Sequence, residues 1–474
     1  MLLRPFLFAA LCFAPFSAAH AHTSPTLLTQ ATTQEVVPTA PVLSVEDAVL
    51  LATQNNPRIT AAVRDISAAS SGVRSARALT NPNAFFAPGV TSVSGTGEEF
   101  LIQQPLEING VRSARTGVAQ AQLRATQAQS ILSLRDVVFT TKSAYYELAR
   151  AREQAIVARE ALQVAQEFDR IARRQVEEGA RPGIDLAQTG LEVSRAERQV
   201  TLADREVTAA LASLNTALGR DTATPVTALT PLAAQPIGST APNMSPVTAA
   251  PSNTVPQPNN GSLSQPPPAS GAVDLGTATL LNQALASRAE IQAGQATGEQ
   301  FRQEARLARA EGRPDIVPQF RVGYFTRGLQ SASDGNGAGI GIALTLPLLD
   351  YGSRKNRIQQ AEQSARAQDA RLVAVQNEVR QQVVQAIARQ RAAESVVQTY
   401  RGGTLEQARV LLEGSRVGFR EGRTSVVALL EAQRSFRAVQ NEYVNALADA
   451  AIARADLERA TGGVSASLLP VVTR

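Results

Sequence analysis

The chain has 474 residues and a net charge of +5, from 46 Lys and Arg against 41 Asp and Glu. Only 4% of its residues are aromatic and none is Trp, whereas a large compact core normally depends on aromatic bulk. The positive charge is almost entirely Arg, which alternates with Glu, Gln and Asp and forms no basic cluster. This pattern is typical of solvated helix faces and argues against a nucleic-acid partner, which would require clustered cations.

Residues 1–21 have the pattern of a secretory signal peptide. Arg4 is followed by a short apolar run, and Ala19-His20-Ala21 places small residues at the expected cleavage positions. A lipidated N-terminus is an alternative in which Cys12 would be modified, although Leu11 is larger than the residue that usually precedes such a cysteine.

Cleavage after Ala21 would remove Cys12, the only cysteine, and His20, one of the two histidines. The other, His22, lies in residues 22–43, which we predict to be a flexible tail. The folded body then lacks thiol nucleophiles, histidine bases and most transition-metal ligands, so we predict no catalytic residue, no metal site and no cofactor. Carboxylate-only chemistry, such as that of a cell-wall hydrolase, is an alternative, but no pair of acids marks a site for it.

The first structured element is predicted to be a helix from Val45 to Ala78. Ser44 is its N-cap and Asp47 stands three residues later, as in a capping box. The sequence Asn55-Asn56-Pro57 should break this helix. Two short strands follow at residues 84–93 and 98–108, joined by a tip rich in Gly and Ser.

A very long helix is predicted next, from Arg112 to about Glu177, because this stretch has no Pro and repeats apolar residues at helical spacing. Its roughly 65 residues would extend about 100 Å. Such a length indicates a coiled coil, a membrane span or a helical repeat, and the recurring Arg and Glu exclude the membrane span. Gly179 then reverses the chain, and a shorter helix returns to Gly219.

Residues 222–272 are predicted to be a linker. They contain eleven of the 25 prolines, including Pro266-Pro267-Pro268, and this composition favours an extended or disordered chain over a packed core.

A second copy of the same pattern follows the linker. Gly179 corresponds to Gly422 and Gly219 to Gly462, both 243 residues apart, and residues 104–112 match 346–354 at an offset of 242. The second copy should contain a helix at 276–311, a strand pair within 316–349, a long helix from 353 to about 418 with a flaw at Gly402-Gly403, and a returning helix. The repeats therefore span 44–221 and 273–463, their helical hairpins 112–219 and 353–462, and a C-terminal tail 464–474.

The strands determine the predicted assembly. Ile340, Ile342 and Leu344 alternate with small residues, so each strand has one apolar face. Four such strands cannot close on themselves, and in a membrane every backbone group must be paired. The predicted fold is mainly α: a long antiparallel α-helical coiled-coil barrel, with four strands per chain contributing to a shared 12-stranded transmembrane β-barrel in a trimer.

With this organisation the chain resembles the TolC family of outer-membrane efflux factors. The likeness rests on the double helix-strand-strand-helix-helix repeat, on the Gln-Pro-Leu-x-x-x-Gly-x-Arg motif at 104–112, and on the turn in which Gly179 precedes Leu186 by seven residues. Within the family, residues 105–112 are most similar to the metal-exporter branch of CzcC-like proteins.

The resemblance implies a homotrimer in contact with outer-membrane lipid, with its helical portion in the periplasm. There it would meet a periplasmic adaptor (membrane fusion) protein and an inner-membrane pump, and serve as the passive exit duct of a tripartite efflux or secretion system. Metal ions, drugs, solvents and polypeptides all remain open as cargo. The alternative from another class is a periplasmic coiled-coil scaffold or adaptor without a channel, which would not explain paired strands in both repeats.

The resemblance also implies candidate site residues. Asp185 matches an acidic position of the periplasmic gate, although a carboxylate there also suits a helix N-terminus. In the second repeat one gate acid falls on Ala428 and the other on Glu431, the gate Arg falls on Thr424 beside Arg423, and the aromatic position is Phe419. Candidates for the hairpin turn and adaptor contact are Gly179, Gly183 and Gly422. The strand-to-helix joints are marked by Pro105, Gly110, Pro347 and Gly352.

Overall fold

The computed structural model describes residues 43–87, 96–226, 229–232, 275–326, 336–345 and 351–463. The chain divides into Met1–Pro41 and Val42–Arg474, and all described residues belong to the second unit. The predicted signal peptide, C-terminal tail and Pro347, together with most of the predicted N-terminal tail and linker, lie outside the described residues.

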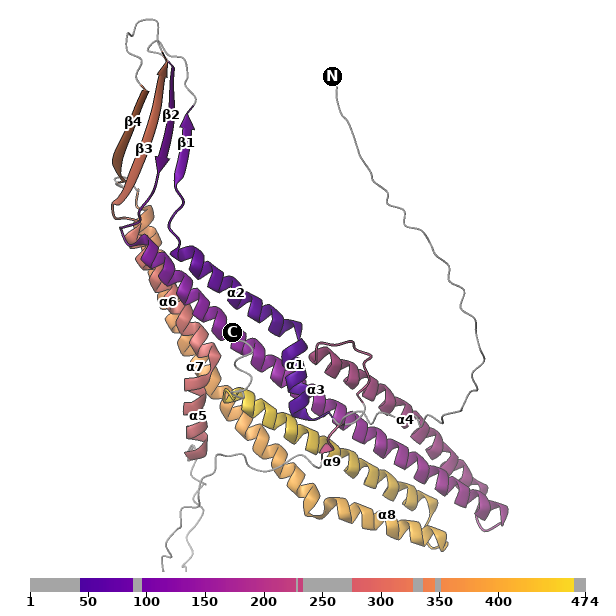
Figure 1. Ribbon diagram of the computed structural model, residues 1–474. Helices are drawn as coiled ribbons and strands as arrows, with labels where there is room; N and C mark the ends of the chain where they lie inside the picture. Colours follow the sequence, from indigo (N-terminus) through magenta and orange to yellow (C-terminus); the bar gives the residue numbers. More distant parts are fainter. Residues whose placement is uncertain are drawn as a thin grey trace, which may run out of the picture. The chain divides into compact units, whose positions relative to one another are not determined.

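The same series of elements occurs twice (Figure 1). The first repeat comprises α1 (Val45–Asn55), α2 (Pro57–Arg77), β1 (Asn83–Ala87), β2 (Thr96–Gln103), α3 (Val111–Glu177) and α4 (Gly183–Ala217). The second comprises α5 (Leu275–Ser287), α6 (Ala289–Ala310), β3 (Asp315–Thr326), β4 (Asn336–Thr345), α7 (Ser353–Thr399), the π-helical turn η2 (Tyr400–Thr404), α8 (Leu405–Arg420) and α9 (Val426–Ala460). The predicted mainly α fold with four strands is confirmed.

The predicted start and break of the first helix are also confirmed. Ser44 Oγ accepts a hydrogen bond from the Asp47 N–H at 3.0 Å, and the Asp47 carboxylate accepts one from the Ser44 N–H, which completes a capping box. α1 ends at Asn55, and the Asn56 side chain caps α2, whose first residue is Pro57.

The single helix predicted at 276–311 is wrong, because α5 and α6 are separated at Arg288 without any Pro. Arg288 has an extended backbone, with φ −69° and ψ 126°, and its Nη1 donates to the Ala460 carbonyl oxygen at 2.9 Å. In the first repeat, Asn56 Nδ2 makes the equivalent bond to the Ala217 carbonyl oxygen at 2.8 Å. A tertiary contact thus produces the same bend in both repeats, although only the first contains a sequence signal for it.

The second strand ends at Gln103 and not at 108 as predicted. Two backbone bonds to β3 continue beyond this end, because the N–H groups of Gln104 and Leu106 donate to the carbonyl oxygens of Pro318 and Ile316 at 3.0 and 3.2 Å. The extended course of the chain then ends at Glu107, which adopts φ 48°. β1 spans Asn83–Ala87 where 84–93 was predicted, and β4 spans Asn336–Thr345, inside the predicted strand pair 316–349.

The four strands form one antiparallel sheet in the order β1-β2-β3-β4. The register aligns Ala84, Ile102, Phe320 and Ile340 in one row and Phe86, Phe100 and Val322 in the next, so that this face of the sheet is apolar. On the opposite face Gln103 and Gln319 lie beside Gly341, and Arg321 lies beside Gly339. Among the described residues, β1 and β4 are each paired on one side only.

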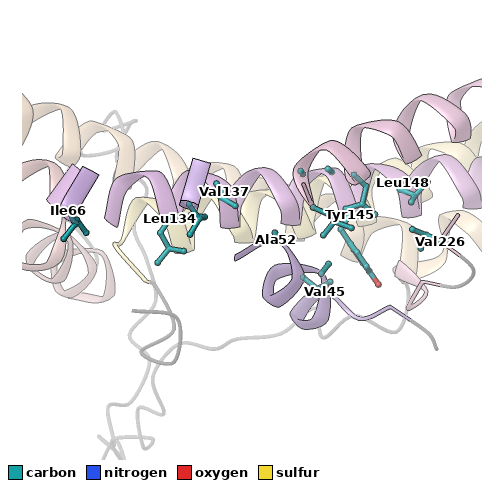
Figure 2. Packing of buried hydrophobic residues seen from close by; sticks show 14 residues of the cluster. Val45, Ala52, Ile66, Leu134, Val137, Tyr145, Leu148 and Val226 are labelled. Atoms are coloured by element: carbon teal, nitrogen blue, oxygen red, sulfur yellow. The ribbon is translucent and has the colours of Figure 1, made fainter. Parts of the chain in front are cut away.

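Each repeat is held together by its own apolar cluster, and the two clusters are equivalent. In the first, α1, α2 and α4 pack on α3 around the fully buried Tyr145, whose hydroxyl donates to the Leu43 carbonyl oxygen at 2.8 Å (Figure 2). In the second, Ala284, Ile291 and Ile387 occupy the positions of Ala52, Ile59 and Tyr145. Burial of each large apolar side chain contributes about 1.5–3 kcal/mol.

Contacts between the repeats are made mainly by α3. It packs against α6 and α9 of the second repeat, besides α2 and α4 of its own. None of the described helices is both long and apolar enough to cross a membrane.

The predicted flaw at Gly402-Gly403 is confirmed as the turn η2, in which Gly403 has φ 137°. Gly110 and Gly179 bracket α3 and are 69 residues apart, whereas the equivalent Gly352 and Gly422 are 70 residues apart. A π-helical turn takes in one more residue than an α-helical turn, so η2 accommodates this extra residue.

Gly219→Ala should lower the stability of the fold more than Gly179→Ala. Both glycines have positive φ, 71° and 69°, so each Ala would pay about 1–2 kcal/mol for the left-handed backbone. At Gly219 a Cβ would also lie 2.6 Å from the Asn55 carbonyl oxygen, whereas at Gly179 nothing lies within 4 Å. Thermal unfolding midpoints of the purified protein in detergent measure the difference, and equal midpoints for the two variants would contradict the proposed overlap.

Candidate functional site at the hairpin tips

Both long hairpins reverse through the same backbone motif. Gly179 and Gly422 are left-handed, with φ 69° and 73°, and each donates to the carbonyl three residues earlier at 3.0 and 3.1 Å. The next residue donates to the carbonyl five residues earlier at 2.9 and 2.8 Å, which completes a Schellman motif in each turn. Gly183 lies beyond the first turn, as the first residue of α4.

Arg181 joins the first tip to the second. Its Nη1 lies 3.1 Å from Asp185 Oδ2, and its Nη2 donates to the Thr424 carbonyl oxygen at 2.9 Å. The guanidinium carbon lies 4.6 Å from the ring centre of Phe419, which is fully buried. Because the side chains of Arg181 and Asp185 are only 14% and 16% exposed, these contacts are partly shielded from water.

Close packing of Gly418 against Thr424 shapes the second tip. The Thr424 N–H donates to the Gly418 carbonyl oxygen at 3.0 Å, and a Cβ on Gly418 would overlap Thr424 Oγ1. This arrangement presents the Thr424 carbonyl to Arg181. The structure therefore brings together two of the four predicted gate residues, Asp185 and Thr424.

The other two predicted gate residues lie apart from Arg181. Arg423 is exposed and pairs with Glu421. Glu431 is 70% exposed, and its carboxylate lies 3.9 Å from Arg434. Both therefore face solvent in the single chain.

Further ion pairs connect the two hairpins behind the tips. The buried Glu192 of α4 accepts from Arg434 of α9 at 2.7 Å, and Glu167 of α3 accepts from Arg416 of α8 at 2.6 Å. Burial acts to raise the pKa of Glu192, but the hydrogen bond and charge of Arg434, with help from Arg195, outweigh it and lower the pKa below its ordinary value. The hydrogen bond from Arg416 likewise lowers the pKa of Glu167.

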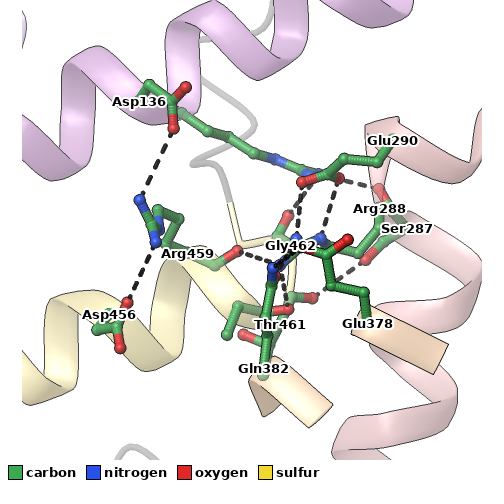
Figure 3. Close-up of polar contacts among 12 residues, drawn as sticks. Asp136, Ser287, Arg288, Glu290, Glu378, Gln382, Asp456, Arg459, Thr461 and Gly462 are labelled. Carbon is green, nitrogen blue, oxygen red and sulfur yellow. Dashed lines mark hydrogen bonds and ion pairs between the residues drawn. The ribbon is translucent and has the colours of Figure 1, made fainter. Parts of the chain in front are cut away.

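A second polar cluster lies where α3 meets the α5–α6 break and the end of α9 (Figure 3). Arg135 Nη2 donates to the carbonyl oxygens of Ser287 and Gly462 at 2.9 and 3.1 Å. Arg288 makes two bonds to Glu290, at 2.7 and 2.9 Å. Burial lowers the pKa of the Arg135 guanidinium, the charge of Glu290 opposes this, and the charge of Arg288 adds to it.

The predicted strand-to-helix joints have similar backbones in the two repeats. Gly110 and Gly352 are left-handed, with φ 86° and 83°, and immediately precede α3 and α7. The Pro105 carbonyl oxygen accepts from Gln104 Nε2 at 2.9 Å. Glu107, which the sequence did not single out, binds Arg115 at 2.7 Å and so fixes the joint to α3.

A groove runs along α8 to the second tip. Its lining combines charged and apolar side chains with two glycines: Glu406, Arg409, Val410, Glu413, Gly414, Val417, Gly418, Arg423 and Thr424. Within the described ranges, no three His, Cys, Asp or Glu residues are grouped as a metal site would require.

Two segments of the chain, residues 49–220 and 280–463, match the family model described as outer membrane efflux protein. The chain belongs to the outer membrane efflux protein family. These segments coincide with the two structural repeats, and the predicted resemblance to TolC-family channels is confirmed. Membership places the chain in the outer membrane, and its family and fold are those of transport channels and not of enzymes.

Individual relatives agree with this family. The outer membrane efflux protein BepC of Brucella suis is 30% identical over 136 residues, which span 29% of this chain and 30% of that protein. The outer membrane protein VceC of Vibrio cholerae is similar in fold, with a TM-score of 0.65, 18% identity, and coverage of 88% of this chain and 96% of that one. The open state of the MtrE outer membrane channel of Neisseria gonorrhoeae has a TM-score of 0.67 at 18% identity, covering 88% and 89%. The finer resemblance to the CzcC-like branch stays a prediction.

Sequence reasoning missed Arg181, although the repeat contained a signal for it. Arg181 and Thr424 are 243 residues apart and so occupy equivalent positions in the two tips. The Arg that the efflux family suggests at Thr424 is therefore found at the equivalent position of the first repeat. Glu192 and Arg434 were missed because nothing in the sequence pairs α4 with α9.

Glu192→Gln should lower the free energy of unfolding at neutral pH and should make that free energy depend less on pH in the acid range. The lowered pKa of Glu192 means that its stabilisation is present above the ordinary Glu value of about 4.3 and is lost as the pH falls through the lower, folded value. The variant should lose about 2 kcal/mol at pH 7, as expected for a charged hydrogen bond, and lose less than the parent on acidification. Unfolding followed by circular dichroism between pH 7 and 3 measures both effects.

The matched control is Glu197→Gln, an exposed position on the same helix. Equal behaviour of the two variants would show that the pair between α4 and α9 does not stabilise the hairpins.

Proposed function

We propose that three copies of this chain form a passive duct through the outer membrane, with the helical hairpins in the periplasm. The duct serves a tripartite efflux or secretion system, and an inner-membrane pump supplies the energy. Family membership supports the channel class, and the sheet carries the argument for the trimer.

The sheet is suited to a wall shared between copies. Its apolar face includes the exposed side chains of Phe86, Ile340 and Ile342, which suits contact with lipid. The opposite face is mixed: Gln103, Gln319 and Arg321 suit contact with water, and Phe85 and Leu101 lie in the row of Arg321. Since lipid offers no hydrogen bonds to the outer edges of β1 and β4, β4 of one copy pairs with β1 of the next until the barrel closes.

The hairpin tips are the proposed periplasmic closure. Arg181 holds the two tips of one chain together through Asp185, Thr424 and Phe419. Release of this contact would let the second hairpin move away from the first and widen the periplasmic end.

The groove along α8 is the proposed contact for a periplasmic adaptor. It reaches the second tip, and its lining alternates Val410 and Val417 with Arg409 and Glu413. Such a mixed surface suits a helical partner with both apolar and charged side chains.

Arg181→Gln should open the duct. The parent protein, extracted from outer membranes, should migrate as a trimer and give mostly closed channels in planar bilayers. The variant should raise the open fraction at least tenfold, because a charged hydrogen bond contributes about 1.5–3 kcal/mol and about 1.4 kcal/mol shifts an equilibrium tenfold. A soluble monomer without conductance would refute the channel and favour a periplasmic scaffold.

Arg423→Gln is the matched control, because Arg423 neighbours Thr424 but its guanidinium pairs only with Glu421 among the contacts described for it. If Arg423→Gln raised the open fraction more than Arg181→Gln did, the exposed Arg423 and not Arg181 would hold the duct closed.

Glu431→Gln should reduce the cation preference of the duct. One exposed carboxylate per subunit near the tip would form a ring that attracts cations, so the ratio of cation to anion permeability should fall by about twofold. Reversal potentials in a salt gradient measure this ratio. Glu413→Gln is the matched control, because the Glu413 carboxylate is also exposed and lies 3.7 Å from Arg416, three residues along the helix. If Glu431→Gln leaves the ratio unchanged, Glu431 does not line the aperture.

A further inference from the structure

A cavity of about 440 Å³ lies between the two hairpins, beside the start of α8. Its wall is built by α3, by the first turns of α8, by α9 and by Leu232, which belongs to the short segment after α4. The start of α8 follows the kink at Gly403, where the helix changes direction (Figure 1). The cavity shares Glu406 and Arg409 with the groove along α8 and extends from there to α3 and α9. Its volume is within the range of cavities that hold small organic ligands.

Most of the cavity wall is apolar. Aliphatic and aromatic side chains from four separate parts of the chain contribute to it: Val157, Leu232, Leu405, Phe436, Val444 and Leu447. Four of them are buried in the chain itself, and Leu405 and Phe436 are half-buried. A wall of this kind favours the apolar body of a ligand without orienting it, so the orientation depends on the few polar groups beside it.

One of these polar groups is a carboxylate without a partner. Glu153 of α3 is half-buried, and among the residues that the structure describes it has no hydrogen bond and no ion pair. By contrast, Glu167 and Glu192 each bind an arginine of the second repeat. Burial raises the pKa of the Glu153 carboxyl, and the charge of Glu160 raises it further, so that ionisation is disfavoured there. A cation placed beside Glu153 would offset both effects.

The other lining groups also favour a cation over an anion. Glu406 and Arg409 are exposed, lie three residues apart on α8 and have opposite charges, which leaves Glu153 as the uncompensated charge of the wall. Phe436 and Tyr443 of α9 contribute two aromatic rings, and the faces of such rings attract organic cations. The cavity therefore combines an apolar wall, two aromatic rings and a net negative charge.

We propose that this cavity binds a small organic cation with an apolar body, the cationic group lying beside Glu153 and the apolar body against Leu232, Phe436 and Leu447. An inorganic cation would leave the apolar wall uncovered, and an anionic amphiphile would meet the Glu153 carboxylate. The inference goes beyond the proposed duct and concerns a site within one chain, so it does not depend on how many copies assemble.

A single tryptophan in the cavity wall tests the site. The chain contains no Trp, so Phe436→Trp and, as a second reporter, Tyr443→Trp each introduce one fluorophore. The full-length protein in dodecyl maltoside at pH 8 is titrated with N-hexylpyridinium, whose cationic ring quenches indole fluorescence on contact. Quenching should saturate at one or both reporters. Phe168→Trp, on the same α3 but outside the cavity, should show only the quenching proportional to concentration that partition into micelles produces. Circular dichroism checks the fold of each variant.

Two glutamates of α3 provide the matched pair of variants. Glu153→Gln, made in the reporter protein, should raise the half-saturating concentration of N-hexylpyridinium at least tenfold, because a charge-assisted contact is lost. Glu160→Gln removes the same charge from an exposed position seven residues along the helix that does not line the cavity, and should change that concentration less than twofold.

An uncharged compound of similar shape separates the charge from the apolar body. 4-Hexylpyridine, neutral at pH 8, should bind more weakly than N-hexylpyridinium and should bind the parent reporter and its Glu153→Gln variant alike. Quenching that stays proportional to concentration at both reporters, equal effects of Glu153→Gln and Glu160→Gln, or equal affinity for the two compounds would each refute the cation site. Any of these results would leave the proposed duct intact, and a protein without conductance could still bind the cation.

Discussion

The edge strands of the sheet and the outer faces of the helices carry groups that need bonding or packing partners. This requirement applies to the sheet and to the helical part alike. Within the described chain, β2 and β3 are paired on both sides, whereas β1 and β4 are paired on one. In the helical part, α3 packs extensively against helices of both repeats, whereas the extensive contacts of α7 are with helices of its own repeat. In a duplicated chain, each contact between elements has two equivalent versions, and the version that is not formed within the chain leaves an open surface. Symmetric assembly of identical chains can cover all such surfaces at once.

Two kinds of polar contact join the elements, bonds to backbone carbonyls and ion pairs, and they lie in different parts of the molecule. Near the α5–α6 break, Arg135 and Arg288 bind backbone carbonyls that no side-chain substitution can remove. Toward the tips, the hairpins are held by Glu192 with Arg434 and by Arg181 with Asp185, which depend on ionisation and partial shielding from water. The first set suits a permanent joint between repeats, and the second suits a contact that is made and released.

Much of this architecture could be predicted from the sequence because long helices, glycine turns and strand alternation are local patterns. The lengths of α3 and α4, the turns at Gly179 and Gly422 and the flaw at Gly403 all followed from residue types and spacing. The break at Arg288 could not be predicted, since it depends on a hydrogen bond to a carbonyl 172 residues away. Arg181 was missed for a related reason: its role arises only where the second tip brings the Thr424 carbonyl beside it.

The turn η2 shows how the second hairpin keeps its contact with the first despite one additional residue. In a continuous α-helix an extra residue would rotate everything beyond it by about 100°. Phe419, seven residues beyond Leu412 in α8, would then face away from α3, and its contact with Phe168 at 6.4 Å between ring centres would be lost. Because η2 accommodates the residue upstream, Phe419 stays buried under the Arg181 guanidinium. One local irregularity therefore preserves the contact of the second tip with α3.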